Sequence, residues 1–301
     1  MTSATEMITP ASKLTGTVTL VNNIYVDDNM ETKDTKKEKQ SKEKQSKEKH
    51  SKEKQSKETK QPAAIKKENN KRVQHILKAS YFENEDSETN GSVFIEVGID
   101  EAGKGPMFGR VYIGAVVLPK DSKQFDFSKM KDSKKFHSDK KIKEAAEYIK
   151  SHAIAWSVTY AEHNEIDEKN IRKSTIDCMH KAVNDIMEKM NQTPDKLYLL
   201  VDGNDFIPMM KLCDDSYIQI PYKCIERGDN TYASIAAASI LAKVAHDEYI
   251  LEMCKEHPCL HTNYDLENNK GYGTKKHMDG IKTHGISQWH RKSFGLCKEF
   301  S

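Results

Sequence analysis

The sequence lacks the features of a membrane protein or of one held together by disulfides. No apolar stretch is long enough to span a bilayer, and the N-terminus has no signal peptide pattern. Its six cysteines stand at irregular spacing, so a disulfide framework is not expected. These absences predict a soluble, intracellular protein, in the cytoplasm or, in a eukaryotic host, in the nucleus.

A strong excess of one charge is also missing. The 48 Lys and Arg residues nearly balance the 46 Asp and Glu residues, which gives a formal net charge of +2. Overall charge therefore predicts no affinity for nucleic acid. Any such affinity has to come from local clusters of lysine, such as the one at residues 129–135.

Apolar residues are distributed unevenly along the chain. Residues 33–60 form a low-complexity tract with a five-residue period, KKEKQ SKEKQ SKEKH, which has no apolar residue to build a core. We interpret residues 1–90 as a disordered extension and residues 91–301 as the folded catalytic domain. The tract is either a basic arm that stays near a polyanion or a plain spacer.

Four residues in CKEHPCLH are metal-ligand types that stand close together: Cys254, His257, Cys259 and His261. Zinc sites usually take two ligands from one short segment and two from a distant one. Here all four fall in a single segment, and Pro258 ends the preceding helical pattern. A helix end is the favoured interpretation, and zinc is the alternative.

Two apolar, β-rich segments, residues 92–100 and 110–119, stand on either side of the glycine-rich loop EAGKGPMFG. This arrangement predicts a tight β-hairpin. The second segment is apolar almost throughout, which is typical of a strand that is covered on both faces. Helices are therefore expected to flank the sheet.

Helices and strands alternate along the rest of the chain. Helical patterns are found at residues 138–152, with Ser138 as N-cap, at residues 170–190, and in the alanine-rich segment from Tyr232 onward. The segments AIAWSVTYAEH, KLYLLVDG and YIQIPYKCIER have the composition of strands. The predicted fold is α/β, a mixed β-sheet flanked by helices, and the polar region after Pro258 is expected to wrap the core.

Four carboxylates stand at predicted strand ends. Asp100 and Glu101 end the first strand, Asp202 ends KLYLLVDG, and Asp229 follows the last strand in the tripeptide RGD. Carboxylates gathered at strand ends repel one another unless a cation lies among them, and hard divalent ions prefer oxygen ligands. Any one of them could be an ordinary exposed acid. Together they predict a site for Mg²⁺ or Mn²⁺.

The loop after the first two carboxylates contains Gly103, Lys104 and Gly105. Glycines let the backbone approach a ligand closely, and the lysine ammonium is available to a phosphate. A Gly-Lys-Gly tripeptide by itself is more often a plain loop. Its position beside Asp100 makes it a candidate substrate-binding element.

Several segments, in order along the chain, resemble the motifs of ribonuclease HII, a family of type 2 ribonucleases H. They are GIDEAGKGPMFGRVYIGAVVL, DSKKF, LLVDGN, RGD, YASIAAASILAKVAHD, NKGYGTKKH and HRKSF, and they cover residues 97–294. The resemblance implies a ribonuclease H-like mixed sheet with a C-terminal helical region. It also implies an endonuclease that hydrolyses the RNA strand of RNA–DNA hybrids and incises DNA at embedded ribonucleotides.

The resemblance also assigns roles to residues. Asp100, Glu101, Asp202 and Asp229 would be the catalytic ligands of two divalent ions, in a hydrolysis that leaves 5′-phosphate and 3′-hydroxyl ends. Substrate contacts are implied for the glycine loop at the 2′-hydroxyl, for Tyr272 at the RNA-to-DNA junction, and for Lys134, Lys243 and Arg291 at phosphates. The alternatives are ordinary packing for the tyrosine and a solvated surface for the three cations.

Three positions depart from the family pattern: Lys104 and Lys292 stand where arginine is usual, and Arg110 where proline is common. A lysine is a point charge without the bidentate fork of arginine, so a looser contact is expected at Lys104. A ribonuclease HIII-type enzyme and a catalytically silent hybrid-binding module remain alternatives. The four carboxylates are all present, which favours an enzyme. We expect a monomer without membrane contact, and accessory subunits stay open.

Overall fold

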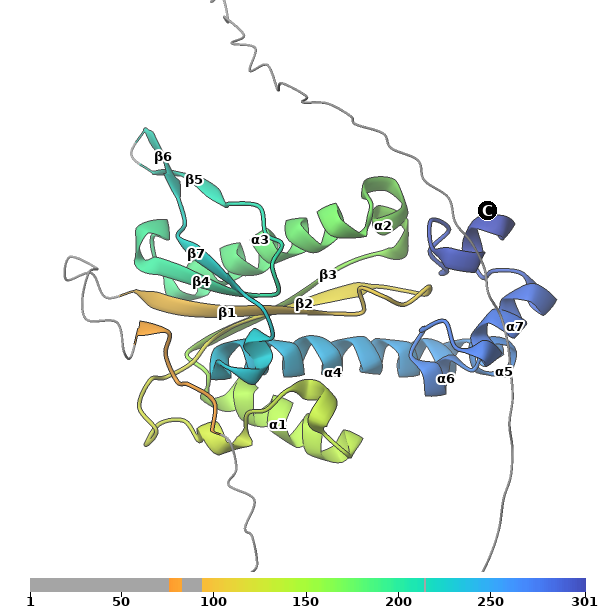
Figure 1. Ribbon diagram of the computed structural model, residues 1–301, viewed down its shortest axis with the longest axis horizontal. Coiled ribbons are helices and arrows are strands. Elements are labelled where there is room, and N and C mark those ends of the chain that lie inside the picture. Colours follow the sequence, from red (N-terminus) through yellow and green to blue (C-terminus); the bar gives the residue numbers. More distant parts are fainter. Residues whose placement is uncertain (1–75, 83–93, 214) are drawn as a thin grey trace, which may run out of the picture. The chain divides into compact units, whose positions relative to one another are not determined.

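The computed structural model describes residues 76–82, 94–213 and 215–301 (Figure 1). Most of the predicted N-terminal extension over residues 1–90, including the lysine-rich tract, lies outside these ranges. The described residues belong to one compact unit of the chain.

A five-stranded mixed sheet forms the centre of this unit. Its strands are β1 (Ile95–Ala102), β2 (Val111–Val117), β3 (Ala155–Ala161), β4 (Leu197–Asp202) and β7 (Tyr222–Ile225). Their order across the sheet is β3-β2-β1-β4-β7. The pairs β1–β2 and β2–β3 are antiparallel, whereas β1–β4 and β4–β7 are parallel. The predicted mixed sheet is therefore confirmed.

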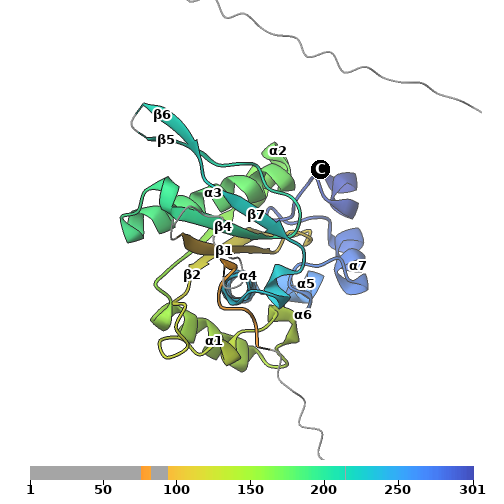
Figure 2. The ribbon, with the colours of Figure 1, turned by 60° about the vertical axis from the view of Figure 1, so that its left-hand side comes forward.

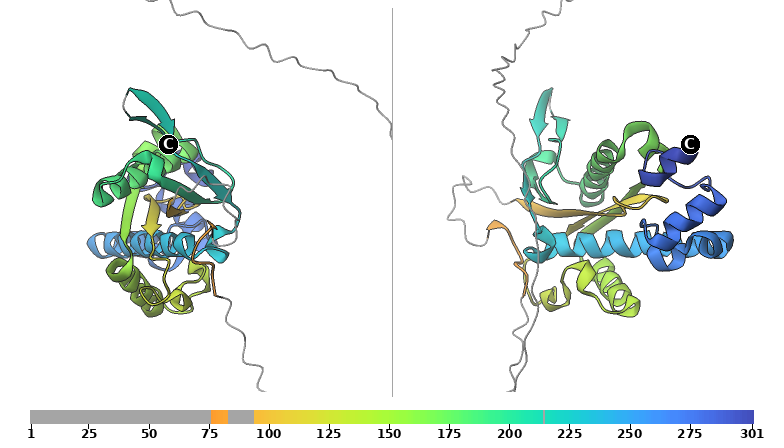
Figure 3. Two further views of the ribbon diagram at one scale, coloured as in Figure 1. Left: turned by 90° about the vertical axis from the view of Figure 1, so that its left-hand side faces the viewer. Right: turned by 45° about the vertical axis from the view of Figure 1, so that its right-hand side comes forward.

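Helices cover both faces of the sheet. On one face lies α3 (Ile171–Met190), which follows the short helix α2 (His163–Lys169); on the other lies α4 (Ala233–Glu256), with α1 (Asp139–His152) packed outside it (Figures 1 and 3). Every residue of β2 is buried, as expected for a strand covered on both faces. Ser138 stands at the N-cap of α1, although its side chain makes no capping hydrogen bond.

The alanine-rich helix α4 approaches the sheet unusually closely because both surfaces carry small residues. A Cβ atom at Gly98 would lie 2.2 Å from the backbone carbon of Ser234, and one at Gly114 would lie 2.2 Å from the carbonyl oxygen of Ala238. Neither position has room for a side chain. The close contact brings Ser239, the next residue of α4, toward the end of β1.

Two details of the predicted sheet were wrong. The hairpin of β1 and β2 has the predicted antiparallel pairing and a connecting loop close to the predicted one, but at eight residues, 103–110, this loop is too long for a tight hairpin. The segment YIQIPYKCIER forms two strands because Pro221 has no N–H for a ladder hydrogen bond. Its first half, β6 (Ser216–Gln219), pairs with the unpredicted β5 (Met210–Cys213) in a hairpin that projects from the body (Figure 2).

A short segment before the predicted domain packs on the folded unit. Leu77 is buried, and Lys78 forms a β-bridge with Tyr232. The Ser80 hydroxyl and the Tyr81 backbone N–H both donate to the carboxylate of Glu96 on β1. The expected domain start at residue 91 leaves out this segment, which carries no strand or helix pattern of its own.

The C-terminal region is helical. It contains α5 (Cys259–Tyr264), α6 (Leu266–Asn269), α7 (Lys275–His284) and the 3-10 segment Gly295–Phe300, gathered near the C-terminal end of α4 (Figure 1). No strand occurs between residues 258 and 301, all of which the structure describes, so the expectation that this region forms no further sheet is confirmed. Among the helices in the described ranges, none has the length and apolarity to cross a membrane.

Candidate active site

The four predicted carboxylates lie at one edge of the sheet. Asp100 and Glu101 lie near the C-terminal end of β1. Asp202 ends β4, and Asp229 lies in the 3-10 turn Gly228–Asn230 after β7. Because β1, β4 and β7 are parallel, their carboxyl ends meet at the same edge. The Asp202 Oδ1 atom accepts a hydrogen bond of 2.7 Å from the backbone N–H of Gly228, which joins β4 to that turn.

Three of these carboxyl groups have raised pKa values. Burial is the main cause for each, and the charge of Asp202 further raises the pKa of Asp100 and of Asp229. The charge of Glu101 adds to the effect of burial on the pKa of Asp202. Lys134 acts in the opposite direction on Asp202 and Asp229. The acidic edge therefore carries negative charge that the protein balances only in part.

A hard divalent cation fits this set of side chains. All the donors are carboxylate oxygens, and an ion among them would offset both the burial of charge and the mutual repulsion that raise the pKa values of the three aspartates. In the described ranges, no three His, Cys, Asp or Glu side chains are already gathered around one point that could hold an ion. The candidate ligands at this edge are Asp100, Glu101, Asp202 and Asp229.

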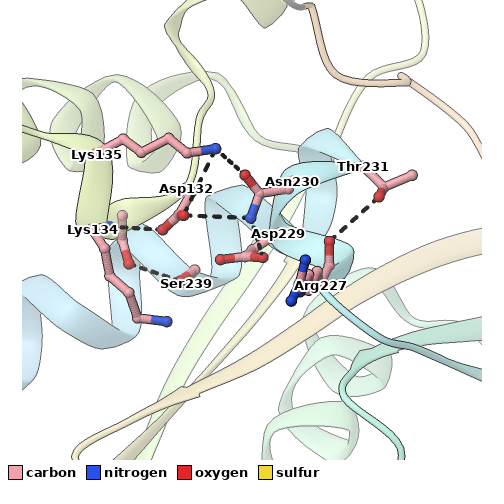
Figure 4. A network of polar contacts seen from close by, with 9 residues as sticks. Asp132, Lys134, Lys135, Arg227, Asp229, Asn230, Thr231 and Ser239 are labelled. Atoms are coloured by element: carbon pink, nitrogen blue, oxygen red, sulfur yellow. Dashed lines mark hydrogen bonds and ion pairs between the residues drawn. The ribbon is translucent and has the colours of Figure 1, made fainter.

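Asp229 is held by a polar network that reaches the loop of residues 132–135 (Figure 4). The Asn230 amide donates to Asp229 Oδ1 over 2.9 Å and lies 3.4 Å from Asp132 Oδ2. Lys135 contacts both Asn230 and Asp132 (Figure 4). Asp132 also accepts a hydrogen bond of 2.9 Å from the backbone N–H of Lys134. Asp132 and Asn230 were missed from the sequence, although they begin DSKK and follow RGD.

Ser239 also joins the site from α4. Its hydroxyl donates to Asp100 and partly opposes the rise in the pKa of that group. It also lies 3.0 Å from the hydroxyl of Ser133 in the DSKK loop. The serine was not predicted to have this role, because only the close packing of α4 on the sheet brings it beside Asp100.

A cleft of about 300 Å³ opens beside Glu101. Six of the predicted substrate-binding residues line it: Gly103, Lys104, Gly105, Lys134, Lys243 and Tyr272. The structure thus brings together groups that are spread over more than half of the folded domain. The Tyr272 ring is half exposed, and a Cβ atom at Gly105 would lie 3.4 Å from it.

Two of the lysines in the cleft have acidic partners. Lys104 Nζ lies 3.1 Å from Glu101 Oε1, and Lys243 Nζ lies 2.7 Å from Asp247 Oδ2. The carboxylate of Asp247 also lies 3.0 Å from His246 Nδ1. Ion pairs of this kind, at a partly exposed surface, contribute little to stability. Both ammonium groups remain at the cleft, where a phosphate can compete for them.

The structure places Arg291 away from the exposed position expected for a phosphate contact. Its side chain is fully buried, with 0% exposure, and its guanidinium donates to the backbone carbonyls of Gly103, Lys104, Pro106 and Gly109 at 2.6–3.2 Å. Burial lowers the pKa of Arg291 to about 10, so the group is still charged at neutral pH. Arg291 thus binds the backbone of the glycine loop from the interior of the domain. The motif HRKSF alone did not predict this contact.

The residues of CKEHPCLH are spread over a helix end, as the favoured interpretation expected. Cys254 is buried in α4, whereas Cys259 is exposed at the start of α5. The His257 ring packs against Trp289, with 4.4 Å between the ring centroids. His261 lies 3.3 Å from Glu267. The four side chains therefore have different neighbours, and in the part of the chain that the structure describes they form no cluster of metal ligands.

The fold and the acidic edge define a ribonuclease H-like protein. Its fold is shared with ribonuclease H2 from Pyrococcus horikoshii OT3, at a TM-score of 0.50 and 18% identity over 68% of this chain and 96% of that chain. It is also shared with Bst-RNase HIII in complex with Mn²⁺, at a TM-score of 0.52 and 18% identity over 69% of each chain.

Sequence comparison then identifies the family. The family model for Ribonuclease HII matches residues 97–297, and the chain belongs to the ribonuclease HII family. The protein named Ribonuclease HII from Parabacteroides distasonis is 42% identical over 205 residues, which are 68% of this chain and 92% of the relative. Its counterpart from Neisseria meningitidis is 36% identical over 200 residues, 66% of this chain and 92% of the relative. The resemblance stated from the motifs is confirmed.

Proposed function

We propose that the protein is an endonuclease that hydrolyses the RNA strand of RNA–DNA hybrids and incises DNA at embedded ribonucleotides. One observation carries the proposal. The four carboxylates lie at one sheet edge, beside a cleft lined by the glycine loop and Tyr272. Membership in the ribonuclease HII family supports the same activity.

The cleft offers distinct contacts to the backbone and the sugar of a substrate. Lys134 and Lys243 supply positive charge for phosphates, which position a duplex without reading its sequence. Gly103 and Gly105 have no side chain, so a ribose can approach the loop backbone closely, and the 2′-hydroxyl is the group that distinguishes RNA from DNA. The half-exposed Tyr272 ring offers a flat surface and a hydroxyl beside this loop.

Asp100, Glu101, Asp202 and Asp229 would hold Mg²⁺ or Mn²⁺. Two such ions would supply an activated water and stabilisation of the leaving 3′ oxygen, which yields 5′-phosphate and 3′-hydroxyl ends. The carboxylates must be ionised to serve as ligands. The positive charge of Lys134 favours the ionised form of Asp202 and Asp229, so this lysine supports the acidic edge as well as the substrate.

The test compares the wild-type protein with Asp202→Asn on three duplexes: one with a single ribonucleotide in DNA, an RNA–DNA hybrid, and an all-DNA duplex. With Mg²⁺ or Mn²⁺, the wild type is expected to cut the first two and to leave the third intact. Asp202→Asn removes one anionic ligand and should reduce cutting by at least about a thousandfold. Binding without divalent cations should stay within about threefold of the wild type.

The matched control is Asp195→Asn, which changes an exposed aspartate paired with Lys196. It is expected to cut as the wild type does. Wild-type protein that binds hybrid but cuts none of the duplexes with either ion would instead show a silent binding module. Mapping the ends of the products would separate a 5′-phosphate outcome from other hydrolytic routes.

A further inference from the structure

Two buried histidines are hydrogen-bonded in series to the backbone of Tyr272, the residue proposed to contact the substrate. His277 on α7 and His290 in the segment before Arg291 both have 0% exposure. Their Nε2 atoms are 3.0 Å apart. His277 Nδ1 lies 2.9 Å from the backbone carbonyl oxygen of Tyr272, and His290 Nδ1 lies 3.0 Å from the backbone nitrogen and 2.8 Å from the hydroxyl of Ser287.

These contacts determine where the protons lie. The Tyr272 carbonyl can only accept, so His277 carries its proton on Nδ1 and presents a lone pair at Nε2. The contact between the two Nε2 atoms then requires the proton of His290. The lone pair of His290 is left on Nδ1, where it accepts from Ser287. The two Ser287 donors share the lone pair of His290 Nδ1, each ring N–H has one acceptor, and both rings are neutral.

The neutral state agrees with the surroundings of the pair. Burial is the main cause that lowers the pKa of both rings, and the neighbouring His277 further lowers that of His290, to about 3. A second proton on either ring would point one N–H at another. The pair therefore has a single arrangement, and that arrangement fixes the Tyr272 backbone from the inside of the domain.

The same C-terminal segment fixes the other side of the cleft. Arg291, next to His290, binds four carbonyls of the glycine loop. The backbone N–H of Met107 in that loop donates to the carbonyl of Gly271, the residue before Tyr272. The histidine pair thus acts on Tyr272 while Arg291 acts on the loop beside it.

We propose that His290 is a positioning residue for the proposed reaction: acting through His277, it sets the position of Tyr272 against the glycine loop. It contributes to recognition of the RNA-to-DNA junction without touching the substrate. This proposal rests on the proposed function, in which Tyr272 contacts that junction. The predicted consequence is a change in selectivity between substrates, with little change in the hydrolysis itself.

The experiment compares His290→Leu with His290→Gln. Leucine leaves the His277 lone pair without a donor, whereas the glutamine amide can replace the Nε2 donor. On the single-ribonucleotide duplex, His290→Leu should lower kcat/KM about tenfold, the effect of one lost hydrogen bond, and on a hybrid with a continuous RNA strand less than about threefold. His290→Gln should recover most of the loss. Thermal unfolding of each variant confirms that it is folded.

A double-variant cycle separates positioning of Tyr272 from a general structural role. If His290 acts through Tyr272, adding His290→Leu to Tyr272→Ala should cause no further loss of selectivity. Equal losses on both substrates, or fully additive losses, would overturn the proposal. If His290→Leu does not fold, Ser287→Ala replaces it, because it removes one of two donors to His290 and should lower the substrate ratio about twofold to threefold.

The two proposals fail in distinguishable ways. A wild-type protein that cuts neither substrate contradicts the proposed function. A wild type that cuts both, together with an unchanged substrate ratio in His290→Leu and in Ser287→Ala, contradicts the positioning role alone.

Discussion

Replacement of Arg291 by methionine tests whether this residue holds the fold or binds the substrate. Methionine fills a similar volume but has no donors. The four carbonyls of the glycine loop would lose their shared partner. Arg291→Lys is the companion variant, because it keeps the charge and up to three donors but not the planar fork.

The magnitude follows from the contacts. A buried carbonyl left without a donor costs roughly 1–3 kcal/mol, and some of the four lie near the cleft, where water can replace the lost donor. We therefore expect Arg291→Met to lower the free energy of unfolding by about 3–5 kcal/mol. For a domain of this size, the melting temperature would fall by on the order of 10 °C. Arg291→Lys should lose about half as much.

Two assays distinguish the roles. Urea and thermal unfolding followed by circular dichroism measure the stability. Binding to a hybrid without divalent cations, measured over a range of salt concentrations, counts the phosphate contacts, because each contact adds about 0.9 to the slope of log K against log salt on a duplex. We expect the slope to stay unchanged in Arg291→Lys. Lys134→Ala, the control at the cleft, should lower it by about one.

The reasoning fails if Arg291→Met is within about 1 kcal/mol of the wild type while the salt slope falls by about one. That combination would mean that the guanidinium leaves its carbonyls and reaches a phosphate in the complex. The original expectation from the sequence would then be correct after all.

Three further predictions follow from the packing and charge of the folded unit. Gly114→Ala should lower the free energy of unfolding by about 3 kcal/mol or more, because the added carbon meets the backbone of α4. Gly105→Ala should unfold like the wild type but lose incision, because its methyl group narrows the cleft. Equal effects of the two variants in denaturant unfolding and in the nicking assay would contradict this. Removal of residues 1–75 should leave turnover intact and weaken binding at low salt. Removal of residues 1–90 should in addition lower the free energy of unfolding by about 3 kcal/mol, because Glu96 loses two hydrogen-bond donors and the buried contact of Leu77 is lost. Equal unfolding curves for the two deletions would contradict this. The pKa of Asp100 is raised in the folded state, so its ionisation destabilises the fold as pH rises through that pKa. At pH 7 without divalent ions, Asp100→Asn should therefore melt at a higher temperature than the wild type, and Mg²⁺ should stabilise the wild type more than the variant. A variant that melts at a lower temperature than the wild type would contradict this.

The sequence by itself determined the main elements of the fold and the candidate acidic residues of the site. The apolar run of β2, the stripe of α3 and the alanine-rich α4 are local patterns with a period of their own, so their lengths and types could be predicted. Asp100, Glu101 and Asp202 could be placed at strand ends because each follows an apolar run directly. Family motifs then connected Asp229 to them.

Only the tertiary structure decided how the cleft is held. The hydrogen bonds of Arg291 join residues more than 180 positions apart in the sequence, and the motif gives the charge of this side chain but not its burial. His277 and His290 acquire their tautomers from one another. The segment with Leu77 has no periodic pattern, and it is fixed by partners on β1 and α4. Such contacts depend on chain segments that meet only after folding, so no local pattern records them.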